Sequence, residues 1–386
     1  MVPISYNLRN LKVRKTTSAA AAFGLALVVF VFASVLMLAN GVKKTMGRSA
    51  RSDVALVLRK GATAEIESVI EDSSINMVIN DTALPQPASG PRGVSESVVV
   101  ILLDKVGADG MSNAQVRGIK PEAFTFRPSV KIVEGRMVQA GSDEAVIGRA
   151  IAGRFKGLSL GESFELKKNR MIKVVGIFAD DGSSTESEVW ADFDTVRTSF
   201  KREGYTSSVR VRVAPAQFET YKASIESNRQ LNLQVFKEAD YFEKQSEGTS
   251  MFISAMGIMI AVFFSIGAML GAMITMHAAV ANRQREIGTL RALGFSKGSI
   301  MLSFLLESII LSLIGGSIGA IASLGMSMVS FSMVNFASWS EIVFRFEADA
   351  GVIVGSMIFA TVMGLVGGFL PAIRAARINP IEAMRA

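Results

Sequence analysis

Four long apolar segments are the feature that most restricts how this chain can fold. They cover residues of about 19–39, 251–276, 300–329 and 350–370, and the last ends before Pro371. An α-helix needs about 20 apolar residues to cross a hydrocarbon core about 30 Å thick, with its backbone polar groups bonded within the segment. Each segment is long enough, so the sequence predicts four transmembrane helices.

Lysine and arginine flank these segments unevenly. They precede the first segment, separate the second from the third, and follow the fourth: Arg9, Lys12, Arg14 and Lys15; Arg283, Arg285, Arg291 and Lys297; Arg374, Arg377 and Arg385. Because such residues accumulate in cytoplasmic loops, we expect both chain ends inside and residues 45–245 outside as one large domain. Membrane orientation then explains the net charge of +7, and the scattered basic residues indicate contact with membrane lipids and no nucleic acid.

The basic start and the first apolar segment have an alternative interpretation as a secretory signal peptide. The apolar run of about 20 residues exceeds the usual length of about 7–15, and no clear A-x-A cleavage site follows it. We therefore expect an uncleaved anchor. Residues 1–18 alternate apolar and basic side chains. This pattern predicts an amphipathic helix on the inner leaflet, with a short disordered tail as the alternative.

Two strand–helix–strand patterns lie at the ends of the external domain. Residues 53–59 and 98–103 have the patterns of strands, and residues 62–73 between them have helical spacing. Strand patterns recur at 207–213 and 231–236, around a helix that Pro215 opens. These patterns predict a split ferredoxin-like layer at 45–106 and 201–245, with a mainly β subdomain inserted at 107–200. The predicted fold class is an α+β membrane protein with four transmembrane helices and a large external α+β domain.

The remaining boundaries follow from the apolar segments. In chain order they are the first span at 19–44, the second at 246–277, a cytoplasmic helix at 278–299, the third span at 300–332, an external loop at 333–349, the fourth span at 350–371 and a cytoplasmic tail at 372–386.

Residues that could carry catalysis or bind a metal ion are few. The chain has no cysteine, which excludes disulfides and cysteine zinc sites. Asp180, Asp181, Glu186 and Glu188 could bind calcium or act in acid–base chemistry, but their spacing does not match an EF-hand, and we expect a solvated turn. The single histidine, His277, is expected at the membrane interface. We predict a non-catalytic chain without a metal site.

Glu307 is the one acidic residue inside an apolar segment. A carboxylate within a membrane is by default a functional hypothesis, for example in proton transport. It lies within about two helical turns of the cytoplasmic end of its segment. From there it could reach basic residues or headgroups, and we expect a packing or interface role.

The short charged stretch at 277–294, HAAVANRQREIGTLRALG, separates the second and third apolar segments. Taken alone, it is either an ordinary basic loop or a helix that contacts a soluble partner. Its R-E-I-G-T-L-R-A-L-G motif and the closing motif P-A-I-R-A-A-R-I-N-P-I-E-A-M-R at 371–385 resemble those of FtsX/MacB/LolC-type permeases of ABC transporters.

The inserted subdomain resembles the MacB-type periplasmic core domain. It has Glu144 before an apolar strand, then a short helix, the strand VVGIF, and the element with Val189, Trp190 and Asp192. By this resemblance, 45–106 and 201–245 form a porter-like subdomain, and the chain lies in a bacterial cytoplasmic (inner) membrane as a multi-pass protein with a large periplasmic domain.

The resemblance identifies the charged stretch as a coupling helix. The residues it implies for contact with an ATPase are Asn282, Arg285, Glu286, Gly288, Thr289, Arg291, Ala292, Leu293 and Gly294. The 386 residues contain no G-x-x-x-x-G-K-[ST] loop, so we expect ATP and Mg to bind a separate ATPase subunit and no cofactor to bind this chain. Glycines four residues apart are expected at helix-packing contacts: Gly267, Gly271, Gly315, Gly319, Gly364 and Gly368.

The implied function is that of the transmembrane subunit of a type VII ABC transporter. Two permease chains, expected to be identical, would pair with two ATPase subunits and with a periplasmic membrane-fusion adaptor. The output would be export or extraction of a lipophilic or peptide-like cargo by motion of the periplasmic domain. The alternatives are an FtsX-like regulator of a periplasmic enzyme without transport, and an ATP-independent receptor or membrane enzyme.

Overall fold

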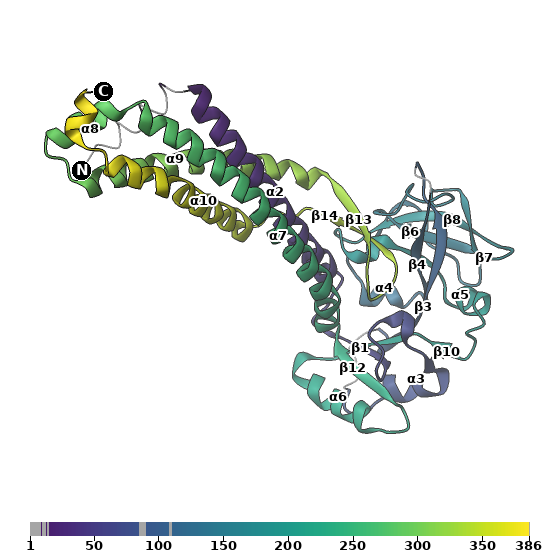
Figure 1. Ribbon diagram of the computed structural model, residues 1–386. Coiled ribbons are helices and arrows are strands. Elements are labelled where there is room, and N and C mark those ends of the chain that lie inside the picture. Colours follow the sequence, from purple (N-terminus) through teal and green to yellow (C-terminus); the bar gives the residue numbers. More distant parts are fainter. Residues whose placement is uncertain (1–8, 10–12, 14, 85–89, 108–109, 386) are drawn as a thin grey trace. The chain divides into compact units, whose positions relative to one another are not determined.

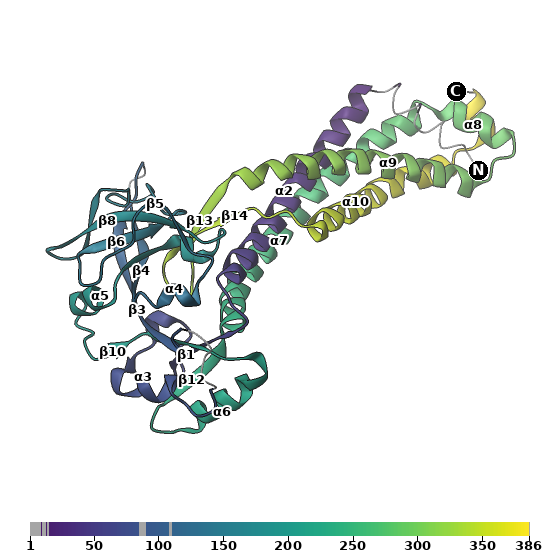
Figure 2. The same ribbon diagram turned by 180° about the vertical axis from the view of Figure 1, so that it is seen from behind.

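The chain divides into two compact units in the computed structural model, which describes residues 9, 13, 15–84, 90–107 and 110–385 (Figures 1 and 2). The helical unit comprises Met1–Gly41, Met251–Val329 and Phe346–Ala386, and the globular unit comprises Val42–Ser250 and Ser330–Arg345. The amphipathic segment predicted at 1–18 lies mostly outside the described residues.

Within the described residues, four helices are long and apolar enough to cross a membrane, which confirms the predicted number of spans. They are α2 (Lys15–Arg48), α7 (Glu238–Ala281), α9 (Lys297–Leu324) and α10 (Ala350–Ala376). The helices α2 and α7 are each unbroken, and each contributes residues to both units.

Two predicted span ends were wrong. The third span was placed at 300–332, but α9 ends at Leu324, and a 3-10 turn (Gly325–Met328) and the strand β13 (Ser330–Val334) follow. The SFSMV sequence alternates polar and apolar residues, which fits a strand better than a helix. The fourth helix does not stop at Pro371 but continues to Ala376. A proline inside a helix removes one backbone bond and crowds the carbonyl four residues earlier, here that of Gly367, and packed transmembrane helices tolerate both effects.

Two of the three glycine pairs lie against a neighbouring helix of the helical unit. A Cβ atom on Gly315 would lie 2.6 Å from the carbonyl oxygen of Ala22 in α2, and one on Gly319 would overlap the carbonyl oxygen of Ala26. Gly364 and Gly368 of α10 lie against Ser308 and Ser312 of α9. Because these glycines have no side chain, α9 can approach α2 closely, and α10 can approach α9 closely.

The third pair does not pack against the described part of this chain. Among the described residues, no atom lies within 4 Å of a Cβ atom built on Gly267 or on Gly271, apart from their own helix and chain neighbours. The expectation that these two glycines pack helices together is therefore wrong for contacts within the helical unit.

The globular unit contains the predicted split ferredoxin-like layer. Its strands are β1 (Val54–Arg59), β3 (Gly93–Asp104), β11 (Ser208–Arg212) and β12 (Leu233–Lys237), and its helices are α3 (Asp72–Ile79) and α6 (Phe218–Ser227). The antiparallel strand order is β12-β1-β11-β3, so each strand–helix–strand unit places its two strands on either side of a strand from the other unit. Figure 1 shows α3 and α6 beside β1 and β12.

The residues predicted as one helix at 62–73 have a different structure. They form a 3-10 turn (Glu65–Glu67) and the short strand β2 (Ile70–Glu71), and α3 begins only at Asp72. Ile70 and Glu71 pair with Thr206 and Tyr205 of β10 (Tyr205–Thr206). This long-range pairing overrides the local helical spacing.

The inserted layer continues the same sheet. Its strands are β4 (Met111–Ile119), β5 (Lys131–Gly135), β6 (Glu144–Gly148), β7 (Ser163–Lys167), β8 (Arg170–Ala179) and β9 (Glu188–Asp192), with the helices α4 (Ala123–Phe126) and α5 (Phe193–Ser199). The first part of β3 pairs with β11 and the rest with β4, so one strand belongs to both layers. The short helix expected after β6 is a series of turns in which Gly153 has a φ of 71°.

The predicted external loop at 333–349 contains a β-hairpin. Strand β13 pairs antiparallel with β14 (Glu341–Arg345), and both strands belong to the globular unit. The side chain of Val343 is buried in the apolar core of the inserted layer, among residues such as Val116 and Val189. The connection between α9 and α10 is thus an integral part of the globular unit.

Candidate functional site

The charged stretch folds as a short helix with a defined end. Helix α8 (Gln284–Ala292) is followed by Gly294 in the left-handed region, with a φ of 92°. The N–H of Phe295 donates to the carbonyl of Leu290 and the N–H of Gly294 to that of Arg291, at 3.2 Å each. This is the Schellman pattern, in which a glycine ends the helix without the steric cost of a side chain.

One side of α8 is held by the chain's own C-terminal helix. Ile287 and Gly288 are buried, and a Cβ atom on Gly288 would lie 2.7 Å from the Cβ atom of Ala383 in α11 (Pro380–Arg385). Both views show α11 beside α8 (Figures 1 and 2). Gly288 was placed in the partner-contact set, but its open side is occupied by α11, so the structure assigns it to helix packing.

A buried ion pair anchors the start of α8 to α9. The guanidinium of Arg283 donates to Glu307 at 3.0 Å and to Glu286 at 3.3 Å, and it lies 5.1 Å from the ring centre of Phe304. Arg283 and Glu307 are both almost fully buried. Glu307 thus contacts a basic residue, as expected for a packing role, and the pair fixes α8 relative to the apolar helices.

The opposite side of α8 and its C-terminal end are exposed. The residues of the predicted contact set that lie on this surface are Asn282, Arg285, Glu286, Thr289, Ala292, Leu293 and Gly294. We call these seven residues the α8 surface. Leu293 leaves 73% of its area accessible, and Arg291 is half-buried with no hydrogen-bond partner for its Nε atom among the described residues. The α8 surface combines charges with an apolar side chain on a fixed helix, a composition suited to a protein contact.

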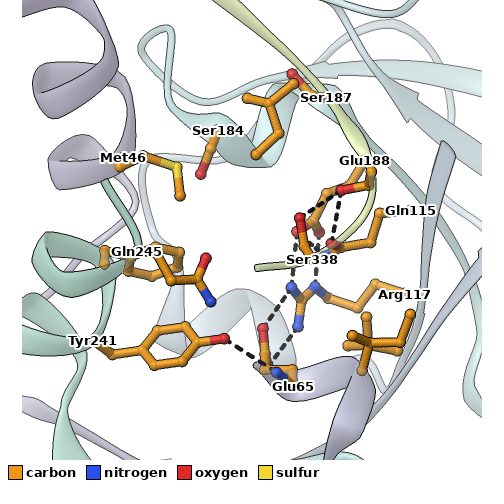
Figure 3. Close-up of a pocket in the computed structure, with 15 residues that line it drawn as sticks. Met46, Glu65, Gln115, Arg117, Ser184, Ser187, Glu188, Tyr241, Gln245 and Ser338 are labelled. Atoms are coloured by element: carbon orange, nitrogen blue, oxygen red, sulfur yellow. Dashed lines mark hydrogen bonds and ion pairs between the residues drawn. The ribbon is translucent and has the colours of Figure 1, made fainter. Parts of the chain in front are cut away.

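A second cluster, which is not among the sites predicted from the sequence, lies inside the globular unit. Seven buried ionisable residues form it, and we call it the Arg117 network: Arg117, Arg127, Arg210, Glu65, Glu96, Glu188 and Glu238. The Arg117 guanidinium donates to Glu188 at 2.7 and 2.8 Å, to Glu65 at 2.9 Å twice, and to Glu96 at 2.7 Å. Figure 3 shows Glu65 and Glu188 converging on Arg117.

The other two arginines complete the Arg117 network. Arg127 donates to both oxygens of Glu96, at 2.5 and 2.8 Å. Arg210 contacts Glu96, donates to Glu65 at 3.1 Å, and donates to Glu238 at 2.8 Å. The network borders a cavity of about 30 Å³ whose lining includes Gln115 and Tyr241 (Figure 3).

Opposite charges keep Glu65 and Glu96 ionised despite burial. Burial alone would raise the pKa of Glu65, but the charges of Arg117 and Arg210 outweigh it and hold that pKa well below its ordinary value. Burial likewise opposes ionisation of Glu96, and Arg127, Arg210 and Arg117 together hold its pKa low. Each charge is paired and hydrogen-bonded, which is the condition for a stable buried ion network.

The prediction of a solvated turn for the acidic residues at 180–188 is wrong. Asp180, Glu186 and Glu188 are buried, and only Asp181 of the four is exposed. Glu186 accepts hydrogen bonds from the backbone N–H groups of Asp180 and Gly182, at 2.7 and 2.9 Å. Glu188 belongs to the Arg117 network. No group of three or more potential metal ligands occurs among the described residues, His277 included.

One sequence signal for the Arg117 network was present. Arg210 alternates with Val209 and Val211 in a strand that has a neighbour on each side in the sheet, and Glu96 and Arg117 also lie in strands of this sheet. A lone charge in a central strand is buried on one face, so it requires a partner of opposite charge. The identity of that partner depends on strand order, which single segments do not reveal.

Two family models match consecutive parts of this chain. The family model described as the MacB-like periplasmic core domain matches residues 18–228, more than half of the chain. The model described as the FtsX-like permease C-terminal matches residues 258–380, which include α8.

Several curated relatives are named macrolide export ATP-binding/permease protein MacB. The one from Burkholderia thailandensis is 32% identical over 293 residues, which cover 70% of this chain and 43% of the relative. The one from Bdellovibrio bacteriovorus is 25% identical over 408 residues, which cover 98% of this chain and 60% of the relative. The chain thus spans about half the length of the curated relatives it matches.

Solved structures also show similarity. The periplasmic region of MacB from Actinobacillus actinomycetemcomitans is 13% identical with a TM-score of 0.38, covering 52% of this chain and 95% of that chain. The extracellular domain of the noncanonic ABC-type transporter YknZ from Gram-positive bacteria is 16% identical with a TM-score of 0.35, covering 47% of this chain and 99% of that chain.

Proposed function

The chain belongs to the FtsX-like permeases that carry a MacB-like periplasmic core domain, and we propose that it is the transmembrane subunit of a type VII ABC transporter. The observation that carries this proposal is the α8 surface. In the sequence, the helix α8 lies between two apolar helices. Its contacts with α11 and the Arg283–Glu307 ion pair hold it in place. Such a fixed, exposed helix is suited to receive force from a soluble ATPase.

We propose that ATP and Mg bind an ATPase subunit outside these 386 residues and that two copies of this chain assemble with two such subunits. The unbroken helices α2 and α7 support transmission of motion to the globular unit, because each contributes residues to both units. The cargo class is lipophilic or peptide-like, and the name of the relatives makes a macrolide a reasonable probe. A periplasmic adaptor is the proposed further partner.

The proposal places the protein in a bacterial inner membrane with the globular unit outside. Reporter fusions that end after Lys201 should report a periplasmic location, and fusions that end after Lys297 should report the cytoplasm, because the short segments beside the apolar helices that carry Lys and Arg are the one around α8 and those at the chain ends. Alkaline phosphatase and green fluorescent protein activities measure the two locations. Cytoplasmic fluorescence at Lys201 would contradict the proposed orientation.

The α8 surface is tested by replacing its exposed apolar residue. Leu293→Asp should reduce recovery of the ATPase at least tenfold, since loss of a buried leucine at an interface costs about 1.5–3 kcal/mol. The measurement is the amount of ATPase that co-purifies with the tagged chain at matched expression. Because Leu293 is exposed within the chain, its replacement should leave the permease folded.

Val106→Asp is the matched control, because Val106 is an exposed apolar residue in the globular unit. It should leave recovery of the ATPase unchanged. Equal recovery with wild type and Leu293→Asp would show that α8 is an ordinary loop helix, and failure of the wild-type chain to recover any ATPase would contradict the transporter proposal itself.

A further inference from the structure

The hairpin β13–β14 is connected to the Arg117 network by hydrogen bonds. The hydroxyl of Ser340, next to β14, donates to Gln115 at 3.4 Å, and the amide of Gln115 donates to Glu188 at 2.7 Å. Glu188 then accepts from Arg117. A residue of the α9–α10 connection is therefore two side chains away from the centre of the network.

The other end of the network reaches the two long helices. Arg210 donates to Glu238, the first residue of α7, at 2.8 Å. The second oxygen of Glu238 accepts from the backbone N–H of Arg51 at 3.0 Å, shortly after the end of α2. An uninterrupted series of hydrogen bonds thus joins the hairpin to the ends of α2 and α7, entirely within the globular unit.

A separate ion pair fastens the hairpin to the inserted layer. The ammonium group of Lys105 lies 2.7 Å from a carboxylate oxygen of Glu341, and the Glu341 side chain is only 4% exposed. The backbone N–H of Val343 donates to the hydroxyl of Ser187 at 3.0 Å, and Val343 itself is buried in the core. If Lys105 is removed, the buried carboxylate of Glu341 loses its charge partner, and release of the hairpin into water would relieve that loss.

We propose that the hairpin is a second coupling element, in which Lys105, Gln115 and Glu341 are positioning residues that make the α9–α10 connection move with the ends of α2 and α7. This inference rests on the proposed transporter function. A fully bonded buried network has one arrangement, so its members respond to displacement as one body. Motion that reaches α2 and α7 would therefore also reach α9 and α10 through the hairpin, in addition to α8.

Attachment of the hairpin can be measured without any partner. The chain has no cysteine, so Val343→Cys creates a single buried thiol. Its reaction with a maleimide in the detergent-purified full chain reports opening of the hairpin. Lys105→Met should raise the labelling rate about tenfold, and the melting transition followed by fluorescence of the buried Trp190 should change little.

Lys156→Met is the matched control. It removes an ion pair with Asp104, which neighbours Lys105, but both side chains of that pair are exposed, at 69% and 49%. Its labelling rate should equal that of the parent. If Lys105→Met labels no faster than Lys156→Met, the ion pair does not hold the hairpin and the proposal is overturned.

The coupling step is tested in the complete complex with erythromycin as the export probe. Lys105→Met should lower erythromycin export per ATP hydrolysed about tenfold, with unchanged recovery of the ATPase. Joining Lys105→Cys to Glu341→Cys with a short bismaleimide should restore the ratio. Faster labelling with an unchanged ratio would show that the hairpin is structural only. If the wild-type chain recovers no ATPase or exports no erythromycin, both the coupling proposal and the proposed function are contradicted. The labelling experiment would still show whether Lys105 holds the hairpin, because it needs no partner.

Discussion

Replacement of Arg117 by leucine is expected to destabilise the globular unit by about 3–5 kcal/mol, the range observed when one partner of a buried ion pair is removed. The Arg117 side chain is 2% exposed and donates to three carboxylates, so the substitution removes neutralising charge from Glu65, Glu96 and Glu188 together. Those carboxylates would then be buried with fewer partners, and leucine cannot donate a hydrogen bond to any of them.

The measurement uses the two tryptophans of the chain. Trp190 is fully buried and its indole N–H donates to Glu188 at 2.7 Å, whereas Trp339 is mostly exposed. In a Trp339→Phe background, fluorescence therefore reports on the surroundings of the Arg117 network alone. We expect the melting temperature of the full chain in detergent to fall by about 10 °C, since each kcal/mol shifts a domain of this size by about 2–4 °C.

Arg136→Leu is the control for this experiment. Arg136 pairs with Glu144 in the same layer, but its side chain is 50% exposed. Exposed ion pairs contribute about 0–1 kcal/mol, so the melting temperature should change by no more than a few degrees. A similar small change for Arg117→Leu would mean that the network adds little to the stability of the native state.

The sequence predicted those features of the fold that depend on local pattern. Apolar length alone indicated the four helices, and alternation in segments such as 207–213 indicated strands whose order across the sheet proved to be ferredoxin-like. The helix end at Gly294 likewise has a local cause, because its left-handed backbone favours glycine. In each case the physical determinant lies within a few residues of the element it controls.

The features that the sequence did not predict depend on residues far apart in the chain. Residues 330–332 continue an apolar segment and are therefore predicted as the end of a span, but pairing with Glu341–Arg345 makes them part of the strand β13. The local pattern predicts Glu188 in a solvated turn, but Glu188 is buried and its partner Arg117 is 71 positions away. Polar residues near glycine resemble a surface turn, and only the tertiary structure identifies the charge that allows their burial.

The contact predicted for Gly288 shows the same limitation at the candidate site. A small residue on a short helix indicates that another backbone comes close, but it does not say which one. The structure supplies Ala383 of the same chain. The α8 surface therefore contains fewer residues than the predicted contact set. Leu293 is its large exposed apolar side chain.

Substitution of Gly319 by leucine is expected to have the second large effect, this time in the helical unit. A Cβ atom at this position would overlap the carbonyl oxygen of Ala26 and lie 3.0 Å from the backbone nitrogen of Phe30 in α2. Backbone atoms cannot rotate away as a side chain can, so α2 and α9 must separate to admit the new side chain. Overpacking usually costs about 1–3 kcal/mol, and we expect a value at or above the upper end, because separation also removes the close contact at Gly315.

The matched control is Gly267→Leu, which makes the same substitution in another G-x-x-x-G pair, where no neighbouring atom of the described residues lies within 4 Å of the added Cβ. It should change stability by less than about 0.5 kcal/mol, as substitutions away from packed sites do. The midpoint of heat-induced loss of the monodisperse peak in detergent, followed by size-exclusion chromatography, compares the two variants with wild type. Equal midpoints for Gly319→Leu and Gly267→Leu would mean that α2 and α9 are not in close contact. A lower midpoint for Gly319→Leu alone would show that the glycines act through the space they leave for α2, because the two substitutions are chemically identical and differ only in what lies opposite.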